Sequence, residues 1–380
     1  MDVSSEYFPQ EDRLSILEQA VPLSQKIGAV HRMVGTHLDF IDRIAVAIYE
    51  AESDLLRTFL SSDRDGKVPI CQYQRPLKDS ASLCEIANLG RPRVINDLDS
   101  FLSDSDALQK LKRKGYAASY TLPMFQRGKL AGFIFFNSGR KHVFVDHVID
   151  HLNMIGHLLG LTVMNDLSSI STLAASVRTA TEFVRSRDFE TGAHLERMAC
   201  YARLIGMGVA ERYGLSDEFI EHLFLFAPLH DIGKLAIPDR VLLKPGRLDE
   251  EEFATMRGHA SQGADIIDAM VANMGIGSLP YVDMLRNIAY LHHEALDGTG
   301  YPRQLKGDEI PIEARIIAVA DIFDALTSVR PYKSAWSNEE AFAELYRLAD
   351  GKISRDCVEA LEAREAEILT IQARCRDLPL

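Results

Sequence analysis

Histidines and carboxylates that could bind metal ions cluster in one stretch of the sequence, HHEALDGTGYP at residues 292–302. Each ring of a buried histidine pair needs partners for two nitrogens, and a metal ion satisfies one nitrogen of each ring directly. The glycines permit a sharp turn after the pair, and Pro302 would fix that turn. Taken alone, the pair is as typical of surface or helix-cap histidines as of a metal site, so the interpretation depends on partners elsewhere in the chain.

Other imidazoles and carboxylates interrupt apolar segments far from this stretch. Glu190 and His194 are four residues apart and would share one face of a helix. In LHDIGK, residues 229–234, the two oxygens of Asp231 could bridge two cations, which a single imidazole cannot do. The candidate metal ligands are Glu190, His194, His230, Asp231, His259, His292, His293 and Asp321.

Asp321 has two readings that the sequence leaves equally open. It lies at the end of the apolar run ARIIAVAD, residues 314–321, where a buried carboxylate without a partner would be costly. Either a metal ion or a salt bridge to Arg315 or Arg330 would satisfy it. The assembled set argues for metal, because its members are the polar exceptions on otherwise apolar helices.

The elements that must position these side chains are predicted to be almost wholly helical. Gly and Pro fall mainly between the helical runs. The expected helices cover residues 195–213, 217–230, 250–256, 261–273, 281–293, 311–328, 338–348 and 357–374, and His259 opens the fourth of them. Before them, residues 146–187 contain hardly a helix breaker and predict one long connecting helix. Its apolar stripe fits a parallel homodimer and packing on its own domain equally well.

The N-terminal part shows a different pattern. An amphipathic helix is expected through Leu14, Leu17, Val21 and Ile27. Strands are expected at residues 43–49, 55–60, 92–97, 118–124 and 130–136, and QRGK at 126–129 predicts a hairpin between the last two. These features indicate an α/β domain with an antiparallel sheet.

Composition limits the classes of function. The 380 residues, 47% hydrophobic and 26% charged, are typical of a globular protein with two domains. A formal charge of −13 argues against broad binding to nucleic acid or to an anionic membrane. Five widely spaced cysteines suggest free thiols in a reducing compartment. With no signal-peptide core and no long uncharged apolar run, we expect a cytoplasmic protein that is not in a membrane.

The N-terminal domain, residues 1–165, resembles a GAF domain, an α/β sensor module. The likeness depends on the strand order, on LPM followed by GKLAGFI, and on SGRKHVF before the next helix. GAF domains bind cyclic nucleotides, haem, tetrapyrroles or nothing, and the sequence does not identify a ligand here.

The C-terminal domain, residues 170–380, resembles an HD-GYP domain, an all-helical branch of the HD hydrolase superfamily that cleaves cyclic di-GMP. The matching motifs are RDFETGAH, LHDIGKLAIPD, LLKPGRL, the His259 segment, HHEALDGTGYP, IPIEARIIAVADIFDAL and RPYK. One departure follows Gly351, where the family often has Phe-Asp-Pro and this chain has Ile353-Ser354-Arg355. That change should affect C-terminal packing more than the site.

The resemblance implies how the ligands are shared. His194, His230, Asp231 and Asp321 would hold one metal ion, and Asp231 would bridge to a second ion held by His259, His292 and His293. Glu190 is associated with a third ion in family members that have a glutamate there. We therefore expect two or three divalent ions, with iron or manganese favoured by mixed imidazole and carboxylate ligands.

The implied reaction is hydrolysis of a phosphodiester. A water between two cations loses a proton more readily than bulk water, and the hydroxide can attack phosphorus in line with the leaving ribose oxygen. Lys234 would neutralise phosphoryl charge or assist the leaving group. Asp324 would orient Lys234 or a water, Arg330 and Lys333 would clamp phosphates, and Gly300-Tyr301-Pro302 would shape the pocket rim.

Several alternatives remain at this stage. The enzyme could prefer another cyclic dinucleotide such as cyclic GMP-AMP, since the motifs do not separate the two. A non-catalytic scaffold that senses a cyclic dinucleotide and engages a signalling partner through the GYP loop is a second class, although such domains usually lose metal ligands. A general HD phosphohydrolase is a third, but HHEALDGTGYP is absent from that broader pattern.

Overall fold

The computed structural model describes residues 12–66, 70–101, 106–185, 192–274, 280–328, 335–349 and 351–375. The chain divides into two compact units, Met1–Leu167 and Ser168–Leu380. Each unit has its own buried apolar core, so each is described by itself.

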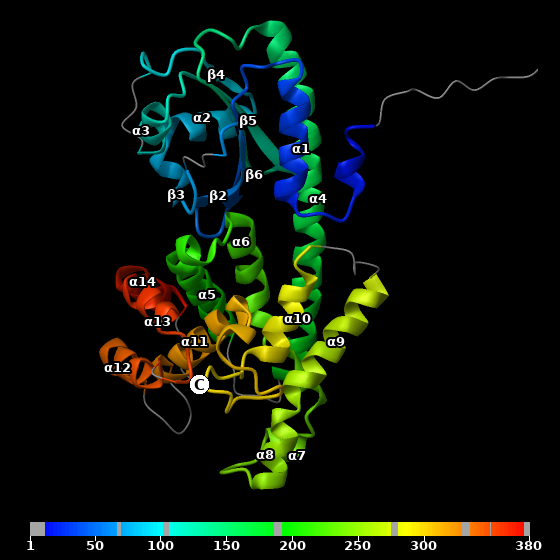
Figure 1. Cartoon of the computed structure of the whole chain (residues 1–380), viewed down its shortest axis with the longest axis vertical. Coiled ribbons are helices and arrows are strands. Elements are labelled where there is room, and N and C mark those ends of the chain that lie inside the picture. The colour runs from blue at the N-terminus through cyan, green and yellow to red at the C-terminus, as the bar shows by residue number, and fades with distance from the viewer. Residues whose placement is uncertain are drawn as a thin grey trace, which may run out of the picture. The chain divides into compact units, whose positions relative to one another are not determined.

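The first unit is built on a six-stranded sheet with the order β3-β2-β1-β6-β5-β4, in which all neighbouring strands are antiparallel (Figure 1). The strands are β1 (Arg43–Glu50), β2 (Leu55–Asp63), β3 (Gln74–Pro76), β4 (Arg93–Ile95), β5 (Ala118–Gln126) and β6 (Lys129–Ser138). The predicted hairpin is confirmed, with Gln126 paired to Lys129. Arg127 and Gly128 between them have φ of 50° and 79°, as a two-residue hairpin turn requires. The short β3 was missed because three residues carry no periodic signal.

Helices cover both faces of this sheet. They are α1 (Leu23–Gly35), α2 (Ala81–Leu89), α3 (Asp106–Arg113) and the first part of α4 (Asp146–Arg185), with 3-10 turns η1 (Ser15–Glu18) and η2 (Leu77–Asp79). Side chains of α1 and α4 share a core with one face of the sheet, and the Lys26–Asp166 ion pair at 3.0 Å joins the two helices. The predicted N-terminal helix is wrong in extent. Pro22, which cannot donate a helical hydrogen bond, separates η1 from α1.

The expected long helix is α4, Asp146–Arg185. Over Asp146–Ser176 it is apolar and long enough to cross a membrane by length and composition alone, a test that the core helix of a soluble domain also passes. Leu152, Leu159 and Val163, at helical spacing, are buried in the core of the first unit. Packing against the sheet therefore accounts for part of the apolar character of α4.

The second unit is helical in its described residues. Its elements are α5 (Gly192–Tyr213), α6 (Asp217–Phe226), η3 (Ala227–Leu229), η4 (Ile232–Ala236), α7 (Asp239–Leu242), α8 (Glu250–Arg257), α9 (His259–Met274), α10 (Val282–Leu291), η5 (Gly307–Glu309), α11 (Ile312–Thr327), α12 (Asn338–Ala349), α13 (Arg355–Glu362) and α14 (Glu365–Arg374). Two predicted helices are shorter than expected. The run 217–230 leaves the α-helix at Phe226 before Pro228, and 357–374 is broken at Ala363 and Arg364 into α13 and α14.

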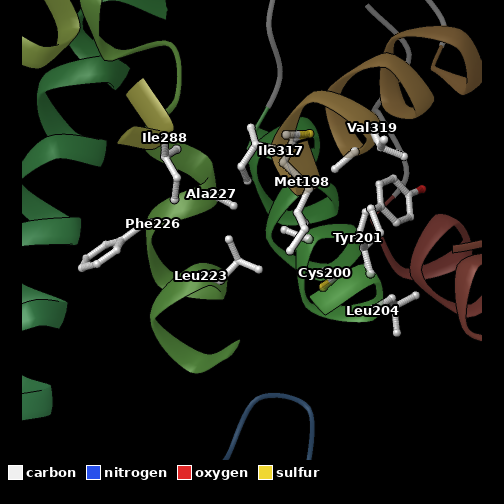
Figure 2. Packing of buried hydrophobic residues seen from close by; sticks show 14 of the residues in the cluster. Met198, Cys200, Tyr201, Leu204, Leu223, Phe226, Ala227, Ile288, Ile317 and Val319 are labelled. Atoms are coloured by element: carbon white, nitrogen blue, oxygen red, sulfur yellow. The ribbon is translucent and has the colours of Figure 1, made fainter. Parts of the chain in front are cut away.

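The core of this unit lies among α5, α6, α10 and α11. Figure 2 shows Met198 and Tyr201 of α5 with Leu223 of α6 and Ile317 of α11, all fully or almost fully buried. Each such side chain stabilises the fold by about 1.5–3 kcal/mol relative to exposure. The departure at residues 353–355 belongs to this packing, as expected. Ile353 is buried in the core, and the Ser354 side chain caps α13.

Candidate metal centre

Two adjacent groups of imidazoles and carboxylates form in the second unit. Within each group, one potential ligand atom per residue lies within 4.8 Å of all the others, a separation that a single cation can span. One group is Asp231, His259, His292 and His293, and the other is His194, His230 and Asp321. Seven of the eight predicted ligands are thus brought together, while Glu190 lies outside the described residues.

The ends of helices supply most of these side chains. His194 lies in the first turn of α5, His259 begins α9, and His292 and His293 follow the last residue of α10. Asp321 comes from the middle of α11. Helix packing therefore decides whether the side chains meet, because the ligands are spread along the chain from His194 to Asp321.

Three of the histidines have their Nδ1 atoms engaged by backbone carbonyls of the preceding turn. The pairs are His230 with Ala227 at 2.9 Å, His259 with Met256 at 2.8 Å, and His292 with Ile288 at 2.9 Å. A ring that donates from Nδ1 leaves the lone pair on Nε2 for a metal ion. The local helix geometry thus selects the tautomer that metal binding needs.

Asp231 lies between the two groups and offers one carboxylate oxygen to each. Its Oδ1 is 3.2 Å from His259 Nε2 and 3.7 Å from His292 Nε2, while Oδ2 is 3.3 Å from His230 Nε2. Among the described residues, Oδ1 is buried and accepts no hydrogen bond. A bridging carboxylate between two cations would have this arrangement, so the residues fit a two-metal centre.

Electrostatics favours the ligating forms of these groups. Burial raises the pKa of Asp231, but Lys234 and His230 outweigh burial and hold that pKa well below its usual range. Burial lowers the pKa of His259, and burial together with the neighbouring His292 lowers the pKa of His293 to about 2. The carboxylate is therefore ionised and these two imidazoles are neutral, as metal ligands must be.

The prediction that Asp324 orients Lys234 or a water is wrong. Asp324 is only 1% exposed, and its Oδ2 accepts a hydrogen bond from His194 Nδ1 at 2.7 Å. Its Oδ1 accepts one from Arg197 Nε at 2.5 Å. Burial raises the pKa of Asp324, but the hydrogen bonds from His194 and Arg197 lower it by more, so the pKa lies below its usual value. Asp324 is thus a positioning residue for the His194 ring.

Sequence reasoning missed Arg197. Besides Asp324, its guanidinium donates to the Cys375 carbonyl at 2.9 Å and to Ser328 Oγ at 2.7 Å. These bonds connect the carboxylate behind His194 to the end of α14 and the end of α11. The available signal was a charged residue three positions after His194, on the same face of the predicted helix.

Lys234 lies beside Asp231, while its predicted role toward the phosphate stays a prediction. Its Nζ is 2.9 Å from Asp231 Oδ2, and the side chain is 21% exposed. The glycine before it is required by a close backbone approach, because a Cβ on Gly233 would lie 1.8 Å from the carbonyl oxygen of His259. The LHDIGK segment can therefore press against the start of α9 only with glycine at this position.

The loop after the histidine pair is held by Glu294, whose role was also missed. This buried carboxylate accepts backbone hydrogen bonds from Arg303 at 2.6 Å and Leu305 at 2.9 Å. A Cβ on Gly300 would lie 2.3 Å from the Ala295 nitrogen. The loop is thus folded tightly back onto the residues that follow the ligands.

This loop places Tyr301, with Pro302 after it, beside the metal ligands. The Tyr301 ring centroid is 4.7 Å from that of His293, and the Arg257 guanidinium lies 5.9 Å from the same tyrosine ring. Burial raises the pKa of the Tyr301 hydroxyl, which therefore stays protonated and can donate a hydrogen bond. Arg257 was not singled out, because a lone arginine at the end of a helix carries no specific signal.

The remaining sequence predictions concern arginines and a lysine. Arg315 forms an ion pair with Asp308 at 3.0 Å. Asp321 instead lies 4.0 Å from His230 Nε2, within the second ligand group. Arg330 and Lys333 lie outside the described residues, so their predicted contacts with phosphate stay predictions.

Comparison with known proteins identifies both units. The model of the HD domain family matches residues 182–356, and the model of the GAF domain family matches residues 27–163. The chain therefore carries a GAF domain followed by a mostly helical HD domain. The predictions of a GAF domain and an HD domain are confirmed. The antiparallel sheet of the first unit agrees with the GAF prediction.

Curated relatives match about half of the chain. A protein named cyclic di-GMP phosphodiesterase response regulator RpfG, from Xanthomonas campestris pv. campestris, is 45% identical over 49% of this chain and 46% of its own length. One named cyclic di-GMP phosphodiesterase, from Thermotoga maritima, is 44% identical over 50% and 49%. One named 3'3'-cGAMP-specific phosphodiesterase 2, from Vibrio cholerae, is 39% identical over 51% and 35%. The matched segment spans less than half the length of each of these relatives.

Replacing Asp324 with asparagine should weaken metal binding. The amide cannot accept hydrogen bonds from both His194 and Arg197 in the same way as a carboxylate, so the His194 ring loses its fixed orientation. We expect the affinity of metal-free protein for Mn²⁺ to fall about 10- to 100-fold, measured by isothermal titration calorimetry. Asp308→Asn, which removes an exposed carboxylate that also pairs with an arginine, is the matched control. Unchanged affinity in Asp324→Asn would contradict the assignment.

Replacing Gly233 with alanine should separate the LHDIGK segment from α9. The added methyl group would overlap the backbone of His259, which cannot move without displacing its ring. We expect a loss of about 1–3 kcal/mol of unfolding free energy by urea titration, together with weaker Mn²⁺ binding. Gly351→Ala is the control, since nothing lies within 4 Å of a Cβ there. Equal losses in both variants would show that the close approach is unimportant.

Proposed function

We propose that this chain, a GAF domain followed by an HD domain, is a metal-dependent phosphodiesterase that hydrolyses cyclic di-GMP to pGpG, with GMP as the product of a second cleavage. The observation that carries the proposal is the pair of adjacent ligand groups with Asp231 between them. The names of the relatives that match about half of the chain support the choice of reaction and substrate.

The two groups would each hold one divalent ion. His194, His230 and Asp321 would bind the first, and His259, His292 and His293 the second, with Asp231 shared. When bound, such ions lower the pKa of a water molecule and polarise phosphoryl oxygens. Nitrogen and carboxylate donors without thiolate favour iron or manganese. Glu190 remains a predicted ligand for a third ion.

Residues of the chain complete the site around the reacting phosphate. The Lys234 ammonium, beside Asp231, can neutralise a phosphoryl oxygen and can give a proton to the leaving ribose oxygen. The protonated Tyr301 hydroxyl provides a hydrogen-bond donor at the edge of the centre. Arg330 and Lys333 are proposed to hold the second phosphate of the cyclic dinucleotide.

Cyclic GMP-AMP is a second candidate substrate, because three of the matching relatives are named 3'3'-cGAMP-specific phosphodiesterases. Both dinucleotides carry the same two phosphodiesters, so the metal centre cannot distinguish them. Competition between the two substrates for one enzyme sample would rank them by kcat/KM.

A scaffold without catalysis is less well supported. All seven described ligands are present and gathered, whereas a domain used only for binding does not need them. A signalling protein that docks on the GYP loop remains compatible with either role, since this loop follows the ligand pair and Tyr301 is only half-buried.

The chain is further proposed to act as a homodimer through α4, with the GAF domain controlling hydrolysis. Within the first unit, Met154, Leu158 and Leu161 are 67%, 36% and 71% exposed and recur at four- and three-residue steps. These side chains form one apolar face of α4, opposite the stripe buried against the sheet. A second copy of the same face, packed in parallel, would remove it from water.

We propose a cytoplasmic location. All five cysteines lie in the described residues and are free thiols, and the three in the second unit are buried there. Free thiols are typical of a reducing compartment.

Exchange of both central ligands should abolish hydrolysis. For His230→Ala with Asp231→Ala, we expect kcat/KM for cyclic di-GMP to fall at least about 1,000-fold, because both ligand groups lose a member. Purification and assay are anaerobic with iron or manganese, and chromatography follows pGpG. His157→Ala, an exposed histidine of the GAF unit, should retain activity. Absence of product from wild-type protein with either metal would reject the proposed function.

Charge on the exposed face of α4 should prevent dimer formation. Met154→Glu with Leu161→Glu places carboxylates where a second copy would pack, and two such charges cannot be buried without partners. We expect a dimer for the wild-type chain and a monomer for the variant at micromolar concentration, by light scattering. Leu89→Glu, at another exposed apolar position, is the control. A wild-type monomer, or an unaltered variant dimer, would refute this interface.

A further inference from the structure

A cavity lies inside the GAF unit, on the face of the sheet opposite the helix pair α1 and α4. It encloses about 870 Å³ of space between atoms, part of it open to solvent. Strand residues such as Ala45 of β1 and Phe135 of β6 form its floor, and Leu83 of α2 and Leu108 of α3 contribute to its walls.

The charge of the lining is one-sided. Four arginines line the cavity, and no aspartate or glutamate does so among the described residues. The four are Arg43, Arg57, Arg75 and Arg93. In a chain with a net charge of −13, a cavity whose charged side chains are all cationic is unexpected. The arrangement needs a reason, because burying charge of one sign is costly.

Arg43 is the most deeply buried of the four, at 3% exposed. Its Nε donates to Ser61 Oγ at 3.2 Å and its guanidinium donates to Asn137 Oδ1 at 2.9 Å. Asn137 in turn donates to Ser119 Oγ at 3.0 Å, which completes a polar row across four strands. All these partners are neutral. Burial lowers the pKa of Arg43 to about 10.

Arg93 enters the cavity from β4 and is also held by neutral groups. It donates to Thr121 Oγ1 at 3.2 Å and to the Ser82 hydroxyl. Its guanidinium lies 5.6 Å from the centre of the Phe101 ring. Burial lowers the pKa of Arg93 to about 10 as well. No carboxylate lies within ion-pair distance of Arg93 or Arg43 in the described part of the chain.

The other two arginines have internal acceptors, and this contrast is informative. Arg57 forms an ion pair with Glu50 at 3.1 Å, and Arg75 donates to the backbone carbonyl of Asp79. The acidic groups that act on Arg43 and Arg93 do so only beyond ion-pair distance. Asp63, which acts on Arg43, already accepts a hydrogen bond from the Tyr116 hydroxyl. The buried Arg43 and the partly buried Arg93 therefore line the cavity without a carboxylate of the described residues at ion-pair distance.

Most of the remaining lining is apolar, although several hydroxyl side chains also reach the cavity. Leu98 is fully buried, and Ile95, Leu111 and Ile70 are at most 8% exposed. Such walls can contact the apolar, unsaturated portion of an organic ligand. They cannot replace the water molecules that a free inorganic ion loses on binding. The cavity thus combines positive charge with apolar surface, as sites for amphiphilic anions do.

We propose that this cavity binds a small organic anion, with a carboxylate or phosphate group paired to Arg43 and Arg93 and an unsaturated body against the apolar walls. The anion would supply the negative charge that the protein withholds, through charge-assisted hydrogen bonds to both guanidinium groups. This makes the GAF unit a sensor for an acidic metabolite-sized compound, independently of the reaction proposed for the HD unit.

The test uses the full-length chain stripped of metal, so that anions cannot bind at the metal centre. Isothermal titration calorimetry compares benzoate and phenyl phosphate with their neutral counterparts benzamide and phenol, and with inorganic phosphate. Binding of one anion and not the other distinguishes a carboxylate from a phosphate site. We expect one site per chain for at least one of the aromatic anions at millimolar concentration or below, and none for the neutral compounds or inorganic phosphate.

Matched variants locate the site. Arg93→Gln keeps hydrogen-bonding capacity without charge and should weaken the anion at least tenfold, and Arg93→Lys should restore part of the affinity. Arg91→Gln, an exposed arginine two residues away, should have no effect. Thermal unfolding checks that the Arg93 variants remain folded. Binding of neither aromatic anion, equal binding of the neutral counterparts, or unchanged binding in Arg93→Gln would overturn the proposal.

Discussion

The carboxylate of Asp231 is the interaction on which the organisation of the HD unit depends. Its two oxygens face histidines from opposite sides, Nε2 of His230 on one side and Nε2 of His259 and His292 on the other. Such an arrangement requires the end of η3, the start of α9 and the end of α10 to converge within a few ångströms. Cations bound among these polar groups would offset part of the cost of burying them.

Support for the ligands comes from shells of hydrogen bonds that extend into the scaffold. Backbone carbonyls one turn back fix three of the imidazoles, whereas His194 depends on the distant Asp324. Arg197 connects that carboxylate to the carbonyl of Cys375, almost at the end of the described chain. The C-terminal helices thereby contribute to the geometry of a ligand in α5. A metal centre held this way is rigid, which suits chemistry that depends on fixed distances.

The two units treat buried charge in different ways. In the HD unit, buried carboxylates and imidazoles lie close together, and a buried arginine near them, Arg197, is paired with Asp324. In the GAF unit, Arg43 and Arg93 are surrounded by hydroxyls and amides and line an open cavity. One unit is thus arranged to receive cations and the other to receive an anion. Helix α4 belongs partly to each, which makes it the physical connection between the two sites.

The sequence by itself determined the kinds of elements and most of the ligands. Alternation predicted the long strands and the hairpin, and apolar helices interrupted by histidine or aspartate pointed to His194, His230, Asp231, His259 and Asp321, because a polar residue there needs a partner. Element ends were wrong at Pro22, Pro228 and Ala363, where local backbone effects overrode periodicity. Only the tertiary structure decided the partners of Asp324, Glu294, Arg197 and Arg43. Each of their contacts joins residues distant in the chain or depends on a loop conformation. The type of a side chain does not by itself predict which residue will be its neighbour in the folded protein.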